Sequence, residues 1–325
     1  MICVTNRETS PFFNLALEEY CLKDFDDDFF ILYRNDRSVI CGKHQNPYAE
    51  INYPYVKKNN IIVARRLSGG GTVYHDRGNL NYSFITNGLE GDLVNFRKYT
   101  RPVLDLLKKL NVNARLRGKS DLVINGRKFS GNAVHVSGRR VIHHGTLLFS
   151  TDLSELKISL IDRSSVYSGK WVRSIPSEVT NIGEHLEKRI DVAGFCDMFM
   201  EHVIQTIPGC RIFEMSEKDV RMIEDLAARK YSRWDWNFGY SPGYEVEKVL
   251  NTGDGLLKIL ISVKNGIISK AETSGEISGR KGNDPLGKLL VKVPHEEKAI
   301  AKVLARNYGM QPDDPFIRGI SESLF

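Results

Sequence analysis

The sequence lacks the features that mark membrane, secreted and zinc-binding proteins. Its 325 residues contain no apolar run as long as a membrane span, and its N-terminus has no basic segment followed by an apolar one. The five cysteines are scattered, odd in number and without CxxC spacing, which argues against a disulfide framework and against a zinc site. We therefore expect a cytoplasmic protein, or a processed organelle protein, that does not contact membranes.

Internal repeats, low-complexity tracts and dense Lys/Arg runs with interleaved aromatics are also absent from the sequence. A nucleic acid is therefore not the expected partner. The composition is ordinary for a globular protein, with 41% hydrophobic and 26% charged residues, and the length allows a large core and two domains. The formal net charge of +6 favours an acidic partner.

The most informative segment is rich in glycine and flanked by cations. Arg65 and Arg66 precede three consecutive glycines at 69–71, and His75 and Asp76 follow closely. Adjacent glycines lose much backbone entropy on folding, so a fold keeps them where side chains would obstruct a close approach. Bare N–H groups form a nest for an anion, and Arg supplies charge and a bidentate fork. The pattern predicts a loop that wraps a carboxylate or phosphate compound.

The residues around this loop are typical of strands. Apolar and β-branched residues occupy 61–64, 72–74 and 80–85. The glycines are therefore expected to link strands, and not to open a helix after a strand as in a Rossmann or P-loop site. Residues 118–120 resemble the end of a P-loop, but Asn113 stands where that motif needs its first glycine.

Apolar periodicity and turn residues predict the remaining elements. Helices are expected over residues 10–23, 96–110, 192–205, 217–229, 285–292 and 296–307, and strands over 29–33, 39–41, 121–124, 128–136, 141–149, 256–263 and 267–273. The Asn-Gly and Ser-Gly turn signals at 125–126 and 137–138 predict an antiparallel meander of three strands. Polar residues over 162–182 favour a loop, and at least one of Glu18 and Glu19 is expected on a solvated helix face.

Two further motifs lie on the predicted meander. Lys128 precedes an apolar residue and then Ser-Gly-Asn-Ala at 130–133, so its side chain stands beside small residues and can reach a ligand in a pocket. The other motif is His-His-Gly-Thr-Leu-Leu at 143–148. Neighbouring strand residues point to opposite faces, so only one of His143 and His144 is expected to face the pocket, and we expect it to be His144.

These motifs resemble those of the lipoate–protein ligase family, and they occur in the same order. The resembling segments are 14–19, 42–47, 65–79, 128–133, 143–148, 179–181 and 234–239. The resemblance implies an α+β fold. It would have a biotin/lipoate ligase-like catalytic domain over 1–241, with mixed, mainly antiparallel sheets and flanking helices, and a small α+β C-terminal accessory domain over 242–325.

The resemblance implies a reaction in two steps. Free lipoate, or octanoate, would react with ATP to give an acyl-AMP and pyrophosphate, and the acyl group would then pass to a specific lysine of an acceptor protein. ATP would be a substrate and Mg²⁺ a required ion. The implied acceptors are acidic lipoyl-domain proteins, namely the E2 subunits of 2-oxoacid dehydrogenases and the glycine cleavage H-protein. We expect the chain to act as a monomer.

The resemblance also implies roles for individual residues. Lys128 would be the catalytic residue that bridges the α-phosphate and the lipoyl carbonyl oxygen. The residues implied to bind the acyl group and its phosphate are Arg66, Ser68, Gly69, Gly70, Gly71, His75 and His144. Those implied to bind the nucleotide are Val73, Tyr74, Asp76, Gly78, Asn79, Lys128 and Thr180. Asp121 would contact Mg²⁺, although Ser120 stands where the family commonly has Asn.

Other functions are compatible with parts of the pattern. A transferase of the same fold would move lipoyl or octanoyl groups between carrier proteins, and its cysteine-dependent form would need a reactive thiol such as Cys41. A transferase could also use preformed lipoyl-AMP. Biotin ligases share the fold but lack the Arg-Arg-x-Ser-Gly-Gly-Gly pattern, and a non-catalytic protein could bind lipoyl-AMP as a signal. Asp76 could serve only to pin its turn, and Trp234 and Trp236 fit packing residues at the domain junction.

Overall fold

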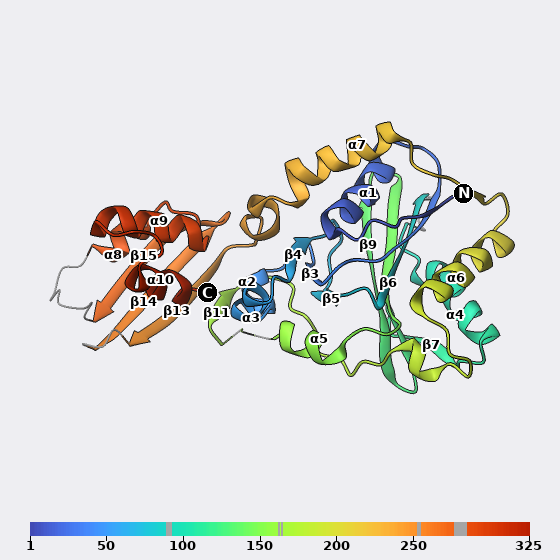
Figure 1. Cartoon of the computed structure of the whole chain (residues 1–325), viewed down its shortest axis with the longest axis horizontal. Helices are drawn as coiled ribbons and strands as arrows, with labels where there is room; N and C mark the ends of the chain where they lie inside the picture. The colour runs from blue at the N-terminus through green and yellow to red at the C-terminus, as the bar shows by residue number, and fades with distance from the viewer. Residues whose placement is uncertain (89–92, 162, 164, 252–254, 276–284) are drawn as a thin grey trace. The chain divides into compact units, whose positions relative to one another are not determined.

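The computed structural model describes residues 1–88, 93–161, 163, 165–251, 255–275 and 285–325, which form two compact units (Figure 1). Unit 1 comprises Met1–Lys43, Ile61–Ile158 and Ser174–Arg233, and unit 2 comprises His44–Asn60, Ser159–Arg173 and Trp234–Phe325. Two segments that interrupt unit 1 in the sequence, His44–Asn60 and Ser159–Arg173, therefore belong to unit 2. The functional division into a catalytic domain over 1–241 and an accessory domain over 242–325 stays a prediction.

Unit 1 is built on an eight-stranded sheet with the strand order β12-β1-β2-β6-β10-β9-β8-β7. The strands are β1 (Ile2–Thr5), β2 (Phe29–Tyr33), β6 (Asn79–Asn87), β7 (Ala114–Arg117), β8 (Asp121–Ile124), β9 (Arg127–Ser137), β10 (Arg140–Leu148) and β12 (Arg211–Ile212). Only the pairings of β1 with β2 and β12 are parallel. The sheet is mixed and mainly antiparallel, and the predicted meander is its β8-β9-β10 part, so both predictions are confirmed.

A second, three-stranded sheet of unit 1 carries the glycine-rich segment. Its order is β4 (Ile62–Arg65), β3 (Ser38–Cys41) and β5 (Val73–His75), with β3 parallel to β4 and antiparallel to β5. The glycines therefore lie on the connection between two strands that pair with opposite edges of β3. This confirms that they link strands and do not open a helix.

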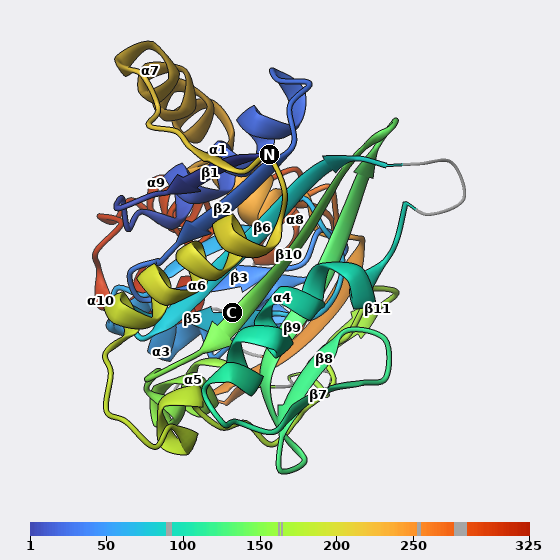
Figure 2. The same cartoon turned by 90° about the vertical axis from the view of Figure 1, so that its right-hand side faces the viewer.

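The core of unit 1 lies between the large sheet and two helices, α4 (Phe96–Lys109) and α6 (Val192–Thr206), which cover one face of it (Figure 2). Both helices were predicted from apolar periodicity. Phe199 of α6 is fully buried and packs edge-on against Phe30 of β2, with 5.3 Å between ring centroids. Shorter elements complete the unit, namely α5 (Leu153–Ser159), which continues into unit 2, η1 (Ile182–His185), α7 (Glu217–Leu226) and η2 (Ala227–Tyr231).

Helix α1 (Pro11–Lys23) begins as predicted, with Ser10 as N-cap and Pro11 in the first turn. The expectation that Glu18 or Glu19 is solvated is wrong, because the two residues are only 3% and 2% exposed. The reason is that α1 is covered twice, by β6 and β10 on one side and by α7 and η2 on another. The elements α7 and η2 lie some 200 positions away from α1 in the sequence. They contact it through hydrogen bonds of Asp219 with Tyr20 and of Tyr231 with Glu19.

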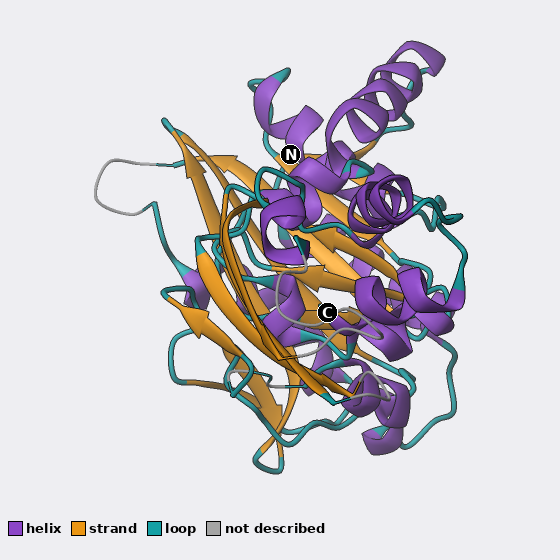
Figure 3. Ribbon diagram, turned by 90° about the vertical axis from the view of Figure 1, so that its left-hand side faces the viewer, coloured by secondary structure: helices purple, strands orange, loops and turns teal. Residues whose placement is uncertain are grey.

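Unit 2 is an antiparallel sheet with helices packed on it. The order of its strands is β11 (Tyr167–Gly169), β13 (Tyr244–Asn251), β14 (Leu256–Lys264) and β15 (Ile267–Gly275). The helices are α2 (Pro47–Glu50), α3 (Tyr53–Lys58), η3 (Asp235–Gly239), α8 (Leu286–Leu290), α9 (Glu297–Tyr308) and α10 (Pro315–Ser323), and Figure 3 distinguishes the helices of the protein from its strands. The predicted hairpin of β14 and β15 turns at Asn265 and Gly266, which both have positive φ.

Sequence reasoning did not find several elements, among them the strands β7, β11, β12 and β13 and the helices α2, α3, α5 and α10. Strand β11 lies inside the segment 162–182 that was expected to be a loop, and residues 162 and 164 of that segment lie outside the described residues. In the part of the chain that the structure describes, no helix combines the length and apolar character needed to span a membrane.

Truncating Phe199 to Ala should lower the free energy of unfolding of unit 1 by about 3–5 kcal/mol, because it removes a fully buried ring from the core. The measurement is urea-induced unfolding followed by circular dichroism. Met222→Ala on α7 is the control, since this side chain is 42% exposed and its loss should change the free energy by no more than about 0.5 kcal/mol. Equal effects of the two substitutions would contradict the assignment of the core.

Candidate active site

Arg66 lies directly after β4 and shapes the glycine loop from within. Its Nε donates to Ser68 Oγ at 3.0 Å, Nη1 to the Ile40 carbonyl at 3.0 Å, and Nη2 to the carbonyls of Gly69 and Gly71 at 2.6 and 2.8 Å. Burial lowers its pKa to about 10, so the guanidinium stays charged at neutral pH. The side chain expected to bind the acyl–phosphate group thus gives most of its N–H groups to the loop itself.

The glycines of the loop differ in what their lack of a side chain permits. Gly70 has a φ of +90°, which a residue with a side chain rarely adopts. Its carbonyl oxygen would lie 2.1 Å from a Cβ added at Gly42, so the loop packs backbone against backbone after β3. A Cβ at Gly69 would meet no protein atom within 4 Å. The loop is therefore closely packed at Gly70 and open at Gly69.

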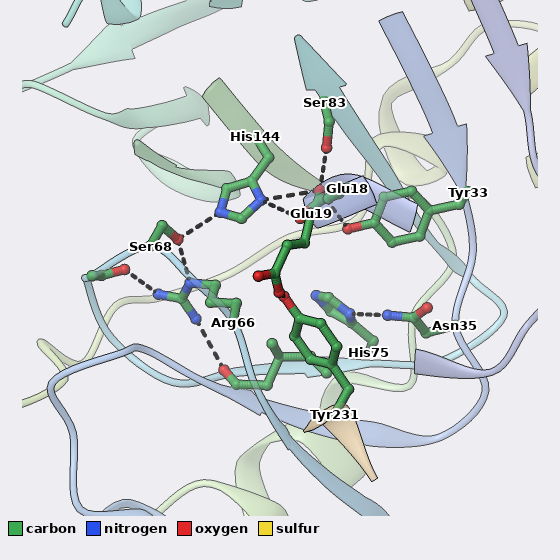
Figure 4. A network of polar contacts seen from close by, with 12 residues as sticks. Glu18, Glu19, Tyr33, Asn35, Arg66, Ser68, His75, Ser83, His144 and Tyr231 are labelled. Carbon is green, nitrogen blue, oxygen red and sulfur yellow. Dashed lines mark hydrogen bonds and ion pairs between the residues drawn. The ribbon is translucent and has the colours of Figure 1, made fainter. Parts of the chain in front are cut away.

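A chain of hydrogen bonds joins Arg66 to Glu18 through the side chains of Ser68 and His144 (Figure 4). Ser68 Oγ lies 2.6 Å from His144 Nε2, and His144 Nδ1 lies 3.0 Å from Glu18 Oε2. Every donor finds an acceptor when Arg66 donates to Ser68, Ser68 to His144 Nε2, and His144 Nδ1–H to the carboxylate. The chain thus connects a buried cation to a buried anion.

Glu18 is held as a carboxylate despite its burial. Burial raises the pKa of Glu18. The interaction with His144 and the hydrogen bonds from Ser83 and Tyr33 together lower it by more, so the pKa lies below its ordinary value of 4.5. Its negative charge offsets that of Arg66 at the other end of the chain. We call the four residues Arg66, Ser68, His144 and Glu18 the buried relay.

The neighbouring Glu19 has a different role. It accepts from Lys23 Nζ at 2.5 Å, Lys230 Nζ at 2.6 Å and the Tyr231 hydroxyl at 2.7 Å. Burial raises the pKa of Glu19, and these donors lower it below the ordinary value. Glu19 thereby fastens α1 to η2, while Glu18 faces the glycine loop.

The two adjacent histidines of β10 separate as the alternation of a strand requires. His144, which we expected at the site, contacts Ser68. His143 stacks on Tyr99 of α4 at 4.0 Å between ring centroids, and its Nε2 accepts from the Asn95 amide at 3.1 Å. His143 therefore belongs to the core side of the sheet.

His75 ends β5 next to the buried relay. Its Nδ1 lies 2.9 Å from Asn35 Nδ2, and the ring is 4% exposed. Burial first, and then the charges of Arg66 and His144, lower its pKa to about 3, so the ring is neutral at neutral pH.

Lys128 lies near the start of β9 and forms a second group with Asp121. Its Nζ is 2.8 Å from Asp121 Oδ1, and Arg117 approaches the other carboxylate oxygen at 3.4 Å. A Cβ added at Gly131 would lie 3.2 Å from this Nζ, so the small residue leaves room for the lysine. At 26% exposed, Lys128 can reach a ligand without leaving its strand.

The segment from Ser174 to Thr180 connects the glycine loop to Lys128. Ser174 Oγ accepts from the Thr72 amide at 2.9 Å. Further along, Lys128 donates its N–H to the Glu178 carbonyl at 2.8 Å and accepts from the Thr180 amide at 3.0 Å. Four residues of extended chain span at most about 14 Å, so the two groups lie within reach of one small ligand.

The residues expected to bind nucleotide have partners inside the protein. Asp76 accepts from the amides of Gly78 and Asp152 at 2.9 and 2.8 Å, so it pins the turn between β5 and β6. A Cβ at Gly78 would come within 2.3 Å of a backbone oxygen. The side chain of Asn79 donates to Asn81, the hydroxyl of Tyr74 to Glu155, and that of Thr180 to Glu184. Val73 is half-buried on β5. Nucleotide binding by these residues stays a prediction.

Sequence reasoning missed the site contacts of Glu18, Asn35 and Ser174. Glu18 lies in the 14–19 segment noted as a motif, which was the one signal that could have singled it out. Asn35 and Ser174 lie outside every motif, and only their contacts with His75 and Thr72 reveal them.

Replacing Glu18 with Gln should lower the free energy of unfolding at neutral pH by about 3 kcal/mol, because it leaves the Arg66 charge without its counter-charge. The folded-state pKa of Glu18 is depressed, so its contribution is present above pH 4.5 and is lost as the pH falls through the folded-state pKa.

The difference in the free energy of unfolding between wild type and Glu18→Gln should therefore become smaller toward acid pH. The measurement is urea unfolding at about pH 7 and about pH 4, with Glu8→Gln as the control because Glu8 is exposed. A difference that does not change with pH would contradict an ionised Glu18.

Comparison with known proteins agrees with this geometry. A family model described as the lipoyl protein ligase A/B catalytic domain matches residues 10–204. The chain is 37% identical to lipoate-protein ligase LplJ of Bacillus subtilis, over 94% of this chain and 93% of that protein. It is 36% identical to lipoate–protein ligase 1 of Staphylococcus aureus, over 92% of each.

Solved structures give the same result. One is a lipoate-protein ligase A bound with ATP, which is 27% identical and matches 73% of this chain and 98% of its own length with a TM-score of 0.63. Another is a bi-partite lipoate protein ligase of Thermoplasma acidophilum, at 26% identity over 73% of this chain and 96% of that one, with a TM-score of 0.63. The chain therefore belongs to the lipoate–protein ligase family.

Proposed function

We propose that this chain activates free lipoate with ATP to lipoyl-AMP and transfers the lipoyl group to a lysine of an acceptor protein. Its membership of the lipoate–protein ligase family supports this reaction. The observation that carries it is the pairing of the glycine loop, supported by the buried relay, with Lys128 at the other end of the segment from Ser174 to Thr180.

In the first step a carboxylate oxygen of lipoate bonds to the α-phosphorus of ATP, and the bond from that phosphorus to the β-phosphate oxygen breaks. Both reactants are anions, so cations must reduce their repulsion. Lys128 Nζ is a half-buried point charge with three donors. We assign to it the stabilisation of the oxygens that gain negative charge as pyrophosphate leaves. In the second step the acceptor amine attacks the acyl carbon, loses a proton, and AMP leaves.

The glycine loop is oriented to receive an anion. Arg66 holds the Gly69 carbonyl, and because the peptide bond is planar and trans, the N–H of Gly70 in the same peptide points away from Arg66. The open side of the loop at Gly69 then lets a ligand reach this backbone. We assign to the loop the binding of the acyl–phosphate group, and to Arg66, Ser68 and His144 its support.

Asp121 fits a magnesium ion that arrives with the nucleotide. Among the described residues no group of three or more His, Cys, Asp or Glu side chains could hold a metal by itself. Mg²⁺ commonly uses one or two carboxylates together with substrate phosphates, and the carboxylate of Asp121 beside Lys128 suits that mode. The ion would neutralise phosphate charge during the first step.

The acceptor in this proposal is a lipoyl-domain protein with an acidic surface, either an E2 subunit of a 2-oxoacid dehydrogenase or a glycine cleavage H-protein. The net charge of +6 supports an acidic partner through steering that weakens with salt. One structural relative is a ligase described together with its E2 lipoyl domain. Octanoate is a second acid of the right chemistry, and the proposed active form is the monomer.

A cysteine-dependent transferase has no support from the site. Cys41 is fully buried on β3, and burial raises the pKa values of Cys3 and Cys196 to about 12 and about 11. A nucleophilic cysteine needs an accessible thiolate.

Lys128→Ala should lower pyrophosphate release from ATP, Mg²⁺ and lipoic acid by about 10²–10³-fold, because it removes a charge contact made in the transition state. Lys108→Ala on the exposed surface of α4 is the control and should release pyrophosphate like wild type. Intact mass of a lipoyl-domain acceptor measures the second step. If the folded wild type releases no pyrophosphate, yet loads the acceptor from preformed lipoyl-AMP, then the proposal that the chain activates free lipoate is wrong.

A further inference from the structure

A line of three asparagines, of which Asn14 and Asn35 are fully buried, leads to His75. Asn6 Nδ2 donates to Asn14 Oδ1 at 2.5 Å. Asn14 Nδ2 in turn lies 3.0 Å from the Glu8 carbonyl, 3.2 Å from the Arg34 carbonyl and 2.8 Å from Asn35 Oδ1. Backbone carbonyls only accept, so the nitrogen of Asn14 is fixed as the donor on that side. Asn35 must therefore turn its oxygen toward Asn14.

The orientation of Asn35 decides which nitrogen of His75 carries the proton. The amide oxygen of Asn35 faces Asn14, so its NH₂ group faces His75 Nδ1 at 2.9 Å (Figure 4). An NH₂ group can only donate, so Nδ1 must be the lone-pair nitrogen. The ring is neutral, as its low pKa shows, and its single proton is therefore on Nε2.

That proton has no acceptor in the part of the protein that the structure describes. Nε2 of His75 is buried and has no hydrogen-bond partner there. A buried donor left unsatisfied costs about 1–3 kcal/mol, and more than about nine in ten buried polar groups do find a partner. In Figure 4 this nitrogen faces away from Asn35, on the side where Arg66 lies. A bound ligand that brings an acceptor atom would satisfy it.

His144 shows the opposite arrangement. Both its nitrogens are used within the protein, with Nδ1 on Glu18 and Nε2 on Ser68. Of the two rings beside Arg66, His75 is thus the one with a donor to offer to a substrate.

We propose that His75 donates Nε2–H to an acceptor atom of the acyl substrate, and that Asn35, oriented by Asn14, is the positioning residue that fixes this tautomer. The inference rests on the proposed function, since it takes the ligand to be the acyl acid. The acceptor is either a carboxyl oxygen or a dithiolane sulfur, and the two can be distinguished because octanoate carries only the first.

The first test is the tautomer itself, read from long-range ¹H–¹⁵N spectra of protein labelled in histidine. The His75 signals are identified by their loss in His75→Gln. We expect the Nε2–H form in wild type, and a change to the Nδ1–H form or to imidazolium in Asn35→Asp, because a carboxylate can only accept. Asn307→Asp, on the exposed surface of α9, should leave the His75 signals unchanged. An Nδ1–H ring in wild type, or an unchanged ring in Asn35→Asp, would overturn the proposal.

The second test compares two substitutions at His75. A Gln amide can place its NH₂ near the position of Nε2, whereas an Asn amide reaches only the position of Nδ1. His75→Gln should therefore keep the KM for the acid within about 3-fold, and His75→Asn should raise it about 10-fold with a smaller change in kcat. If His75→Asn raises the KM for both lipoate and octanoate, the acceptor is a carboxyl oxygen. If it raises the KM for lipoate alone, the acceptor is a dithiolane sulfur.

Equal KM values for His75→Gln and His75→Asn would overturn the proposal. Failure of the proposed function gives a different result, because wild type would then release no pyrophosphate although its His75 tautomer remained measurable.

Discussion

The structure of the site depends on burying two opposite charges without bringing them into contact. Arg66 and Glu18 are each more than nine-tenths buried, and isolated buried charges cost far more than a protein of ordinary stability can tolerate. Ser68 and His144 connect them through hydrogen bonds, because each of these side chains has a polar contact on both sides. This requires the glycine loop, strand β10 and helix α1 to meet at fixed distances, so the relay specifies how these elements pack.

The same requirement gives the loop its shape. Arg66 attracts the carbonyls of Gly69 and Gly71, which turns the amides of the same two peptides, those of Gly70 and Thr72, toward the opposite side. A run of glycines takes one defined conformation because a buried cation orients two of its carbonyl groups. The glycines permit this conformation, but the arginine selects it, and the arginine is tolerated only because Glu18 neutralises it through the relay.

Local patterns in the sequence were sufficient for the strands around the loop, the β8-β9-β10 meander, helix α1 and the expectation that His143 and His144 face opposite ways. Each follows from alternation, turn residues or caps within a few positions. The burial of Glu18, the contact of Asn35 with His75 and the placing of 159–173 in unit 2 were not predictable in this way. They depend on pairs 126 and 40 positions apart and on strand β11 pairing with β13. Such contacts arise from the packing of whole elements, which no local pattern encodes.

The two histidines beside Arg66 show how little separates a structural group from a functional one. Both rings are buried on strands that flank the loop, and each meets one polar side chain at Nδ1. The carboxylate of Glu18 can only accept, so it requires a proton on Nδ1 of His144, and Nε2 of that ring is taken up by Ser68. The amide of Asn35 donates, so it places the proton of His75 on Nε2, where the described protein offers no acceptor. The carboxylate of Glu18 thus holds His144 in hydrogen bonds within the protein, whereas the amide of Asn35 leaves the Nε2–H of His75 available to a ligand.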